Sequence, residues 1–417
     1  MGAVLDGEDI AAPGSIEAAP GSIAWEIAAN GERRILAAGE PEVVMGVIGD
    51  RRWVETQRPG ALIVPGLVNA HVHLDLTDVG RQPFDGDFVS WVKMLQGKRD
   101  GSEQGVRAAV RRGAAMSLAA GVTTVGDIAW WRGAEWSIDG LRRTGLRGVA
   151  FAEIIGLDEH YPTQPMRSLK QAMAMERDAG GVRVGLEAHA PYSTGREIYE
   201  AVTKEAEREN VAVCTHLAEM EAEFDFVRNA SGIFRGFMEE LGTWREEYEA
   251  MYDGGCRPVE WMEQWLKRRR WLLAHCNYVN DEEIELLAGC GASVAYCPRA
   301  SEYFGHGGFR FRFRGRGRGH RYREMMEAGV NVCLGTDSIV CHGSLSIIDE
   351  MRRLHERDGT DAMTLLKMGT VNGMKALGMT ESSGWMLIEA VAKDVVDARQ
   401  AWENVMRSRD ALRITVI

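Results

Sequence analysis

Short runs rich in valine, isoleucine and leucine recur along the chain from about residue 60. Each run ends in polar or charged residues, and a longer stretch follows in which apolar residues return every three or four positions. The short runs predict buried strands and the longer stretches predict amphipathic helices. Eight runs fit the strand pattern: residues 61–68, 123–128, 148–154, 182–187, 211–215, 271–274, 293–296 and 330–335. Eight strand–helix units predict an α/β fold of the (β/α)8 TIM-like barrel type.

Amphipathic segments fill the gaps between these runs. The clearest predicted helices are residues 105–120, 196–209, 281–288 and 345–356. Two connections are longer than the rest: the loop after the first run, and residues 219–270. Long connections of this kind usually shape the substrate pocket of a barrel.

The two ends of the chain show a different pattern of apolar and polar residues. The first sixty residues are broken by glycine and proline into short apolar segments, which predicts a few strands and no helix of useful length. The tail that ends in "ALRITVI" is expected to return to these strands. We therefore predict a small β-domain built from residues 1–60 and 379–417, beside a barrel of residues 61–378.

Composition narrows the class of protein. The 417 residues include 49 Lys and Arg against 61 Asp and Glu, a net charge of −12. This balance disfavours a nucleic-acid partner, and the arginine-rich residues 310–323 are the one patch that could act against it. Seven cysteines without a CxxC pair do not form a disulfide framework. Because no signal peptide or membrane-spanning run is visible, the expected location is the cytoplasm.

Histidines and acids follow several of the predicted strands. His71 and His73 sit at one strand end, where residues two apart share a face, while His216, His275 and Asp337 follow three other strands. A single histidine beside an apolar run is usually structural, but these five residues all fall on the barrel face where enzymes of this fold build their sites. Histidine and carboxylate ligands suit one divalent metal ion, Zn²⁺ or Fe²⁺.

Glu219 comes three residues after His216, where the strand gives way to a helix. This position allows its carboxylate to act as a proton shuttle for water bound to the metal. The alternative is a carboxylate that interacts with the helix dipole, and Glu221 and Glu223 fit that role better.

Seven segments carry a family resemblance. In chain order they are "PGLVNAHVHLDL", "GVTTVGD", "EAHAPYS", "THLAEMEAE", "LLAHCNYVNDEEI", "VAYCPRASEYFGHG" and "VCLGTDS". They resemble the amidohydrolase superfamily, in its branch of aminohydrolases and chlorohydrolases. The segments "FVSWVKML", "FAEIIGL", "FRGFMEELGTW" and "RPVEWM" look most like aminodeoxyfutalosine deaminases of menaquinone biosynthesis, whose neighbours deaminate S-adenosylhomocysteine, methylthioadenosine or guanine.

The resemblance implies a role for each matching residue. The implied metal ligands are His71, His73, His216 and Asp337, and the implied catalytic residues are Glu219, His275 and Asp337. The third and fourth strands end without a lysine, so a single metal ion is implied rather than a bridged pair. The substrate-binding candidates are His189, Glu153, Phe84, Trp91 and Ser301.

The chain departs from the family pattern in three places. Ala300 precedes Ser301 in the "CPRAS" segment, an arginine- and glycine-rich stretch replaces the expected loop, and "AVAKDVVDARQ" replaces the usual turn near the C-terminus. The arginine stretch is interpreted as a solvated loop, with an anion or RNA contact as the alternative.

These features together predict a metal-dependent hydrolytic deaminase of an adenine-type nucleoside, in which a metal-activated water displaces ammonia. A chlorohydrolase, or a deaminase of another heterocycle such as guanine, is the alternative, because the same metal chemistry serves all of them. A non-enzymatic RNA-binding scaffold is a more remote one. The expected partner is a small nucleoside or nucleobase, and no association with a membrane is expected. Self-association as a homodimer is left open.

Overall fold

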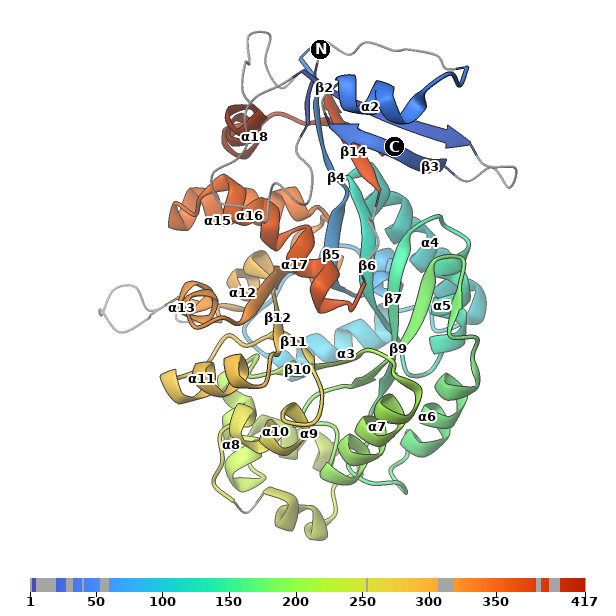
Figure 1. Ribbon diagram of the computed structural model, residues 1–417. Helices are drawn as coiled ribbons and strands as arrows, with labels where there is room; N and C mark the ends of the chain where they lie inside the picture. Colours follow the sequence, from blue (N-terminus) through green and yellow to red (C-terminus); the bar gives the residue numbers. More distant parts are fainter. Residues whose placement is uncertain are drawn as a thin grey trace.

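The computed structural model describes residues 2–4, 20–27, 33–39, 41–52, 60–252, 254–306, 319–379, 384–389 and 398–416. Its main feature is a parallel sheet that curls into a barrel (Figure 1). In chain order its strands are β5 (Leu67–Val72), β6 (Val122–Ala129), β7 (Arg147–Ile154), β9 (Val182–Ala188), β10 (Val213–Leu217), β11 (Leu272–His275), β12 (Ser293–Tyr296) and β13 (Asn331–Leu334). A two-residue strand, β8 (Asp178–Ala179), pairs antiparallel with β9. The predicted TIM-like barrel is confirmed.

The barrel closes where its last strand, β13, meets its first strand, β5. The backbone N–H groups of Thr336 and Asp337 both donate to the carbonyl oxygen of His71, each at 3.1 Å. The side chain of Asn69 donates to Thr336 Oγ1 at 2.8 Å and accepts from the Thr336 N–H at 3.1 Å. These bonds bring the residues that follow β13 next to the end of β5.

Helices cover the outside of the barrel (Figure 1). They are α4 (Glu103–Ala119), α5 (Ala134–Arg142), α6 (Pro165–Ala174), α7 (Arg196–Glu209), α10 (Pro258–Leu266), α11 (Asp281–Gly289), α13 (Tyr322–Glu327), α15 (Ile347–Asp358), α16 (Ala362–Met368) and α17 (Val371–Ala376). The four clearest predicted helices are α4, α7, α11 and α15. Three of these begin at a side-chain cap, in which Ser102, Asn280 or Ser346 accepts a backbone N–H of the first turn.

Further short helices follow the carboxyl ends of the strands. They are η1 (Leu74–Val79), α3 (Phe88–Lys98), α8 (Glu221–Asn229), α9 (Ile233–Glu240), η2 (Glu246–Tyr252), α12 (Pro298–Phe304) and α14 (Ile339–His342). Several belong to the two long connections that the sequence marked as pocket-forming, after β5 and after β10. No helix within the described residues is long and apolar enough to cross a bilayer.

Side chains from seven of the barrel strands fill the barrel interior. Val68, Ile128, Phe151 and Leu272 belong to one buried cluster there, and the cysteines of β10 and β13 belong to it as well. A filled interior is the rule for barrels of this kind, because the inward-facing residues pack in layers. All seven cysteines are free, in agreement with the prediction that the chain lacks a disulfide framework.

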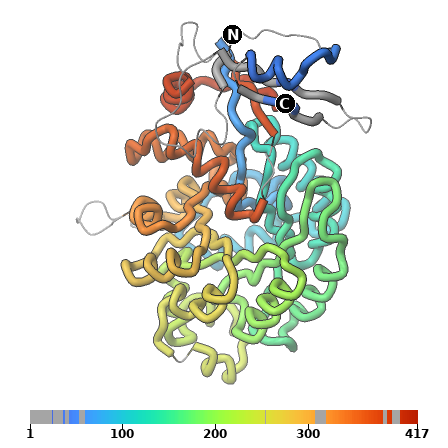
Figure 2. The backbone as a smooth tube through the Cα atoms, viewed as in Figure 1, coloured from blue at the N-terminus to red at the C-terminus, as the bar shows by residue number. Residues whose placement is uncertain are grey.

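A second, mostly antiparallel sheet combines strands from both ends of the chain, as predicted (Figure 2). Its order is β15 (Arg413–Val416), β14 (Trp385–Glu389), β4 (Leu62–Pro65), β1 (Gly2–Val4), β2 (Pro20–Ile27) and β3 (Arg33–Gly39). Helix α18 (Ala398–Arg407) joins this end of the chain to the barrel, since Trp402 Nε1 donates to the carbonyl oxygen of Ala362 at 2.9 Å.

The predicted strand at residues 61–68 is wrong as a single element. Its first half, β4, belongs to the small sheet, where it pairs with β14 and β1, and its second half begins β5 of the barrel. The break falls at Gly66, whose N–H donates to Gly384 O at 2.8 Å and where a methyl group would overlap the side chain of Thr123. Both halves are buried, so hydrophobicity alone does not mark the change of sheet.

The expectation that the first sixty residues hold no useful helix is also wrong. Helix α2 (Pro41–Ile48) packs against β2 and β3 and buries Val44 and Ile48. Val43, Met45 and Val47 lie on its outer side, with exposed fractions of 58%, 42% and 48%. A helix with apolar residues on both sides has no clear amphipathic period, which explains why the pattern did not predict it.

Candidate active site

Five histidine and acid positions predicted from the sequence converge at the carboxyl ends of the barrel strands. His71 lies in β5 and His73 directly after it, His216 lies in β10, His275 ends β11, and Asp337 follows β13. All five residues are buried or nearly so. Because strand ends of a parallel barrel meet at one face, residues that are far apart in sequence become neighbours there.

The three histidines His71, His73 and His216 form a compact group. One ring nitrogen of each lies within 4.8 Å of the others. Asp337 faces the same group, with Oδ1 at 3.5 Å from His73 Nε2 and 3.9 Å from His71 Nε2. Burial lowers the pKa of His71 and His73 well below the usual value, so both rings are neutral at pH 7. Neutral imidazoles and one carboxylate are a donor set suited to a divalent metal ion.

His71 gives a second indication of a metal site. Its Nε2 atom is buried and has no hydrogen-bond partner within the described residues. An unpartnered polar atom inside a protein is costly unless an ion or water satisfies it. The donor set therefore fits a metal ion at this point.

His216 is held from behind by two acceptors. Its Nδ1 lies 3.0 Å from Glu187 Oε1 and 3.2 Å from the carbonyl oxygen of His189. Burial would lower the pKa of His216, but the carboxylate of Glu187 outweighs it and raises that pKa to about 10. With Nδ1 engaged, Nε2 is the nitrogen left for the histidine group.

Glu219 lies beside His275, with 3.7 Å between Glu219 Oε1 and His275 Nε2. Burial is the main cause that raises the pKa of Glu219 to about 7, with a further contribution from Asp337 and an opposing one from His216. A carboxyl with a pKa near 7 can both accept and release a proton at neutral pH, as a general acid–base needs. Burial also lowers the pKa of His275, which is therefore neutral.

The backbone around Glu219 is fixed by two neighbours. Glu223, in the first turn of α8, accepts the backbone N–H groups of Ala218 and Glu219, each at 2.9 Å. Asn277 Nδ2 donates to the carbonyl oxygen of Glu219 at 2.9 Å. Glu223 stands in the first turn of α8, where a carboxylate can interact with the helix dipole, whereas Glu219 precedes the helix.

Four residues of this region have positive φ without being glycine: Ala218 (49°), His275 (75°), Cys276 (50°) and Asp337 (57°). Such backbone conformations cost free energy and persist where the surrounding structure enforces them, often at functional sites. Two of the four residues have contacts from other segments: His320 Nε2 lies 2.8 Å from His275 O, and Cys341 Sγ lies 3.5 Å from Asp337 Oδ2.

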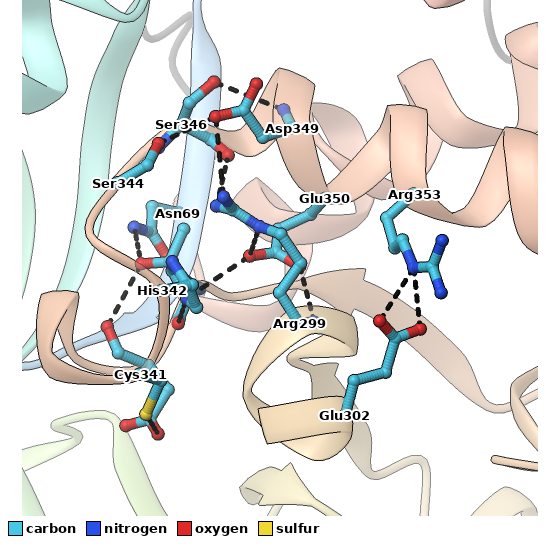
Figure 3. A network of polar contacts seen from close by, with 12 residues as sticks. Asn69, Arg299, Glu302, Cys341, His342, Ser344, Ser346, Asp349, Glu350 and Arg353 are labelled. Carbon is cyan, nitrogen blue, oxygen red and sulfur yellow. Dashed lines mark hydrogen bonds and ion pairs between the residues drawn. The ribbon is translucent and has the colours of Figure 1, made fainter. Parts of the chain in front are cut away.

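A polar network supports the loop that carries Asp337 (Figure 3). Arg299 donates from its backbone N–H and from Nε to the two carboxylate oxygens of Glu350, at 3.0 and 2.8 Å. His342, at the end of α14, bonds through Nε2 to Thr336 O at 2.7 Å, and the same atom lies 3.7 Å from Glu350. The loop after β13 is therefore tied to α12 and α15 as well as to β5.

A cavity of about 500 Å³ opens above these residues. His73, His216, Glu219, His275 and Asp337 line it together with many aromatic side chains, which include Phe88, Trp91, Trp130, Trp131, Tyr192, Phe234 and Phe304. Helices α3 and α9 form two of its walls, and Lys93 on α3 pairs with Glu240 on α9 at 2.6 Å. A mostly apolar cavity with polar groups at one end suits a small heterocyclic ligand.

Three of the substrate-binding candidates line this cavity and two do not. His189, Glu153 and Trp91 are among the lining residues. Phe84 lies outside, in a separate surface depression, where its ring packs near Tyr303. Ser301 is buried elsewhere and donates to Asn277 Oδ1 at 2.8 Å.

Sequence reasoning missed several residues that support the site. Glu187 lies near the end of β9, two residues before His189, which follows the strand, and the alternation of strand side chains could have pointed to it. Arg99 lines the cavity, lies over the ring of Trp130 at 4.6 Å, and pairs with Asp75 at 3.2 Å. Arg99 follows a helix whose packing only the fold defines, so no local signal marked it.

Comparison with known proteins places the chain among enzymes. A family model described as "Amidohydrolase family" matches residues 62–386. The chain is 26% identical over 342 residues to 5-methylthioadenosine/S-adenosylhomocysteine deaminase of Halalkalibacterium halodurans, a match that covers 77% of this chain and 69% of that protein. It is 26% identical over 361 residues to aminodeoxyfutalosine deaminase of Deinococcus radiodurans, which covers 82% and 79% respectively.

A solved structure shares the fold over nearly the whole length. It is the crystal structure of Helicobacter pylori aminofutalosine deaminase in complex with methylthio-coformycin. The TM-score is 0.70 at 17% sequence identity, and the superposition covers 98% of this chain and 97% of that one.

Proposed function

The chain belongs to the amidohydrolase family, and from this premise we propose that it is a metal-dependent hydrolase that removes the exocyclic amino group of adenine-type nucleosides. The class of reaction, hydrolysis of a carbon–nitrogen bond, follows from the family and from the deaminases that the chain resembles. The observation that carries the finer proposal is the convergence of three histidines, Asp337 and Glu219 at the base of one cavity.

His71, His73, His216 and Asp337 are the residues that would hold the metal ion. The three ring nitrogens lie within 4.8 Å of one another, Asp337 Oδ1 faces two of them, and His71 Nε2 has no other partner within the described residues. Three imidazoles and a carboxylate suit one Zn²⁺ or Fe²⁺ ion. A bound divalent ion lowers the pKa of a water molecule toward neutrality and so supplies a nucleophile.

Glu219 is the proton carrier of the proposed reaction. It takes a proton from the attacking water and gives it to the ring nitrogen beside the carbon that bears the amino group. Its pKa of about 7 allows both steps near neutral pH. The bonds to Glu223 and Asn277 hold the backbone of Glu219 in place beside the cavity.

His275 and Asp337 complete the catalytic set. His275, neutral and 3.7 Å from Glu219, orients the water for attack on the ring carbon. Asp337 accepts the second proton of the same water after its oxygen has bonded to the ring carbon. It passes this proton to the amino group, which leaves as ammonia when the carbon–nitrogen bond breaks. One water molecule is consumed and one ammonia is released, so the ring amine becomes a carbonyl.

An adenine-type nucleoside is the substrate class that we favour over guanine or a chlorinated triazine. The two relatives reported above are named for adenine nucleosides or for aminodeoxyfutalosine, and a cavity of about 500 Å³ has room for a ring with a sugar attached. His189, Glu153 and Trp91 are the residues proposed to contact it. A role in menaquinone biosynthesis depends on whether aminodeoxyfutalosine itself is a substrate.

The RNA-binding alternative rests on residues 310–323, most of which lie outside the described part of the chain. Two arginines at its described end make contacts within the protein. Arg321 pairs with Asp281, and Arg323 Nη2 donates to Thr360 Oγ1 at 3.0 Å. These contacts favour a structural role for this end of the segment.

The test is ammonia release from a panel of compounds by the metal-loaded protein. The panel contains adenosine, 5′-deoxyadenosine, 5′-methylthioadenosine, S-adenosylhomocysteine, aminodeoxyfutalosine, guanine and atrazine, and the metal-stripped protein is the control. We expect ammonia from at least one adenine nucleoside, and none after the metal is removed. Absence of ammonia from every adenine nucleoside would refute the proposal, and turnover of guanine or atrazine alone would replace it with the alternative.

A further inference from the structure

Glu187 is a buried acid that has no role in the proposed reaction. It lies near the end of β9 with an exposed fraction of 0%. We propose that Glu187 is a positioning residue: it holds the imidazole of His216 in the orientation that presents Nε2 to the metal ion, and it balances the charge of the bound ion. This inference rests on the proposed function, because it takes His216 as a metal ligand.

The contact geometry supports the orienting role. Glu187 Oε1 lies 3.0 Å from His216 Nδ1, closer than the carbonyl oxygen of His189 at 3.2 Å. Two acceptors on one side of the ring keep the hydrogen on Nδ1. A histidine ligand whose remote N–H is held in this way has a fixed tautomer and a fixed ring plane, and its free nitrogen is a better electron donor.

The surroundings of Glu187 support the charge-balancing role. Apart from the contact with His216, neither oxygen of Glu187 has a hydrogen-bond partner within the described residues. A buried carboxylate in such a place is costly unless a positive charge lies close to it. With Nε2 bound to the ion instead of a proton, His216 is neutral like His71 and His73. Three neutral imidazoles and the Asp337 carboxylate then leave a divalent ion with one uncompensated positive charge. The carboxylate behind His216 compensates it.

Glu153 provides a matched control on the neighbouring strand. It pairs in register with Glu187 across β7 and β9, and it is similarly buried. Its carboxylate, however, accepts from the Trp131 N–H at 3.1 Å and lies 3.7 Å from His189 Nε2. A carboxyl of the same type and depth is therefore present without a contact to a proposed ligand.

The test measures metal binding rather than turnover. Wild type, Glu187→Gln, Glu187→Asp, Glu153→Gln and His216→Ala are stripped of metal, checked for folding by circular dichroism, and titrated with Zn²⁺ against a chromophoric chelator. Each is also loaded with Co²⁺, whose visible absorption reports the orientation and number of its ligands. Glutamine at position 187 keeps the shape and an oxygen acceptor but removes the negative charge. Aspartate keeps the negative charge, but its shorter side chain places the carboxylate farther from His216.

We expect Glu187→Gln to bind Zn²⁺ about 10- to 100-fold more weakly than wild type, the usual effect of removing such a partner. Its Co²⁺ spectrum should shift. Glu187→Asp should fall between the two, and it serves in place of the glutamine variant if that protein does not fold. Glu153→Gln should change affinity and spectrum much less than Glu187→Gln does, since Glu153 does not contact His216.

The outcomes separate this inference from the proposed function. If Glu187→Gln binds Zn²⁺ like wild type and has an unchanged Co²⁺ spectrum, the positioning role is wrong while the ligand set stands. Equal weakening in Glu187→Gln and Glu153→Gln also overturns it, because burial rather than contact would then explain the loss. If wild type does not retain the ion, or if His216→Ala retains it equally well, both the ligand set and the role of Glu187 are refuted.

Discussion

Replacement of Glu219 by glutamine distinguishes a proton carrier from a carboxylate that stabilises a helix start. The amide has the same shape and can keep a contact with His275, but it cannot carry a proton between water and the substrate. We expect turnover to fall about 10²- to 10⁴-fold, the range for loss of general acid–base catalysis, while metal content stays at the wild-type level.

The same substitution should not weaken the fold. Burial raises the pKa of Glu219 from 4.5 to about 7, so the folded protein holds this proton more tightly than the unfolded chain does. The free energy of unfolding therefore falls as pH rises through that window, by about 3 kcal/mol at pH 7. Because glutamine carries no charge, metal-free Glu219→Gln should be at least as stable as metal-free wild type at pH 7 and above.

A helix-stabilising carboxylate predicts the opposite pair of results. Its loss would cost about 0.3 to 1 kcal/mol of stability and leave turnover nearly unchanged. The assay measures melting temperature on the metal-free protein, and metal content and ammonia release on the loaded protein from the same preparation. A metal-replete Glu219→Gln enzyme with near-normal turnover would remove Glu219 from the mechanism.

His216→Ala should lose the bound ion, and ammonia release with it, because the ligand set is incomplete; normal metal content by elemental analysis would contradict this. Stability should fall as pH drops from about 6.5 toward 4, by about 1.4 kcal/mol per pH unit for each buried neutral histidine that must gain a proton on unfolding; a melting temperature that stays flat from pH 7 to 5 would exclude it. The histidines in question are His306, His320 and His342, whose pKa is lowered by burial to about 4. Gly148→Ala should abolish soluble expression, since φ is 143° and a methyl group there would overlap Val125 O; a soluble variant with a wild-type melting curve would refute this.

The sequence predicted the barrel because its signals are local. Short buried runs and amphipathic helices alternate with the period of the fold, and α7 was predicted with its observed bounds. The hydrophobic pattern failed where both halves of one apolar run are buried in different sheets. This happens at Gly66, where the chain passes from the small sheet to the barrel. It also failed at α2, whose exposed valines and methionine hide the helical period.

The positions of the proposed ligands were predictable for a related reason. His71, His216, His275 and Asp337 each stand at a strand end, and a closed parallel barrel gathers all strand ends at one face. Their roles as ligands and catalysts stay predictions. Residues that act through others could not be predicted in the same way. Ser301 donates to Asn277, and Asn277 in turn donates to the backbone of Glu219, through contacts that exist only when helix α12 and the segments after β10 and β11 are packed together.

The seam that closes the barrel has a consequence for how the protein is made. Asn69 and Thr336 are 267 positions apart in sequence, and their bonds join the first strand to the last. During synthesis the histidines of β5 emerge early, but the carboxylate of Asp337 reaches them only after β13 has been translated and has docked. The nascent chain therefore cannot assemble the four-residue group one strand at a time, and in the proposed enzyme metal loading would belong to the last stage of folding. A truncation before β13 should leave early histidines that bind metal ions weakly and with little selectivity.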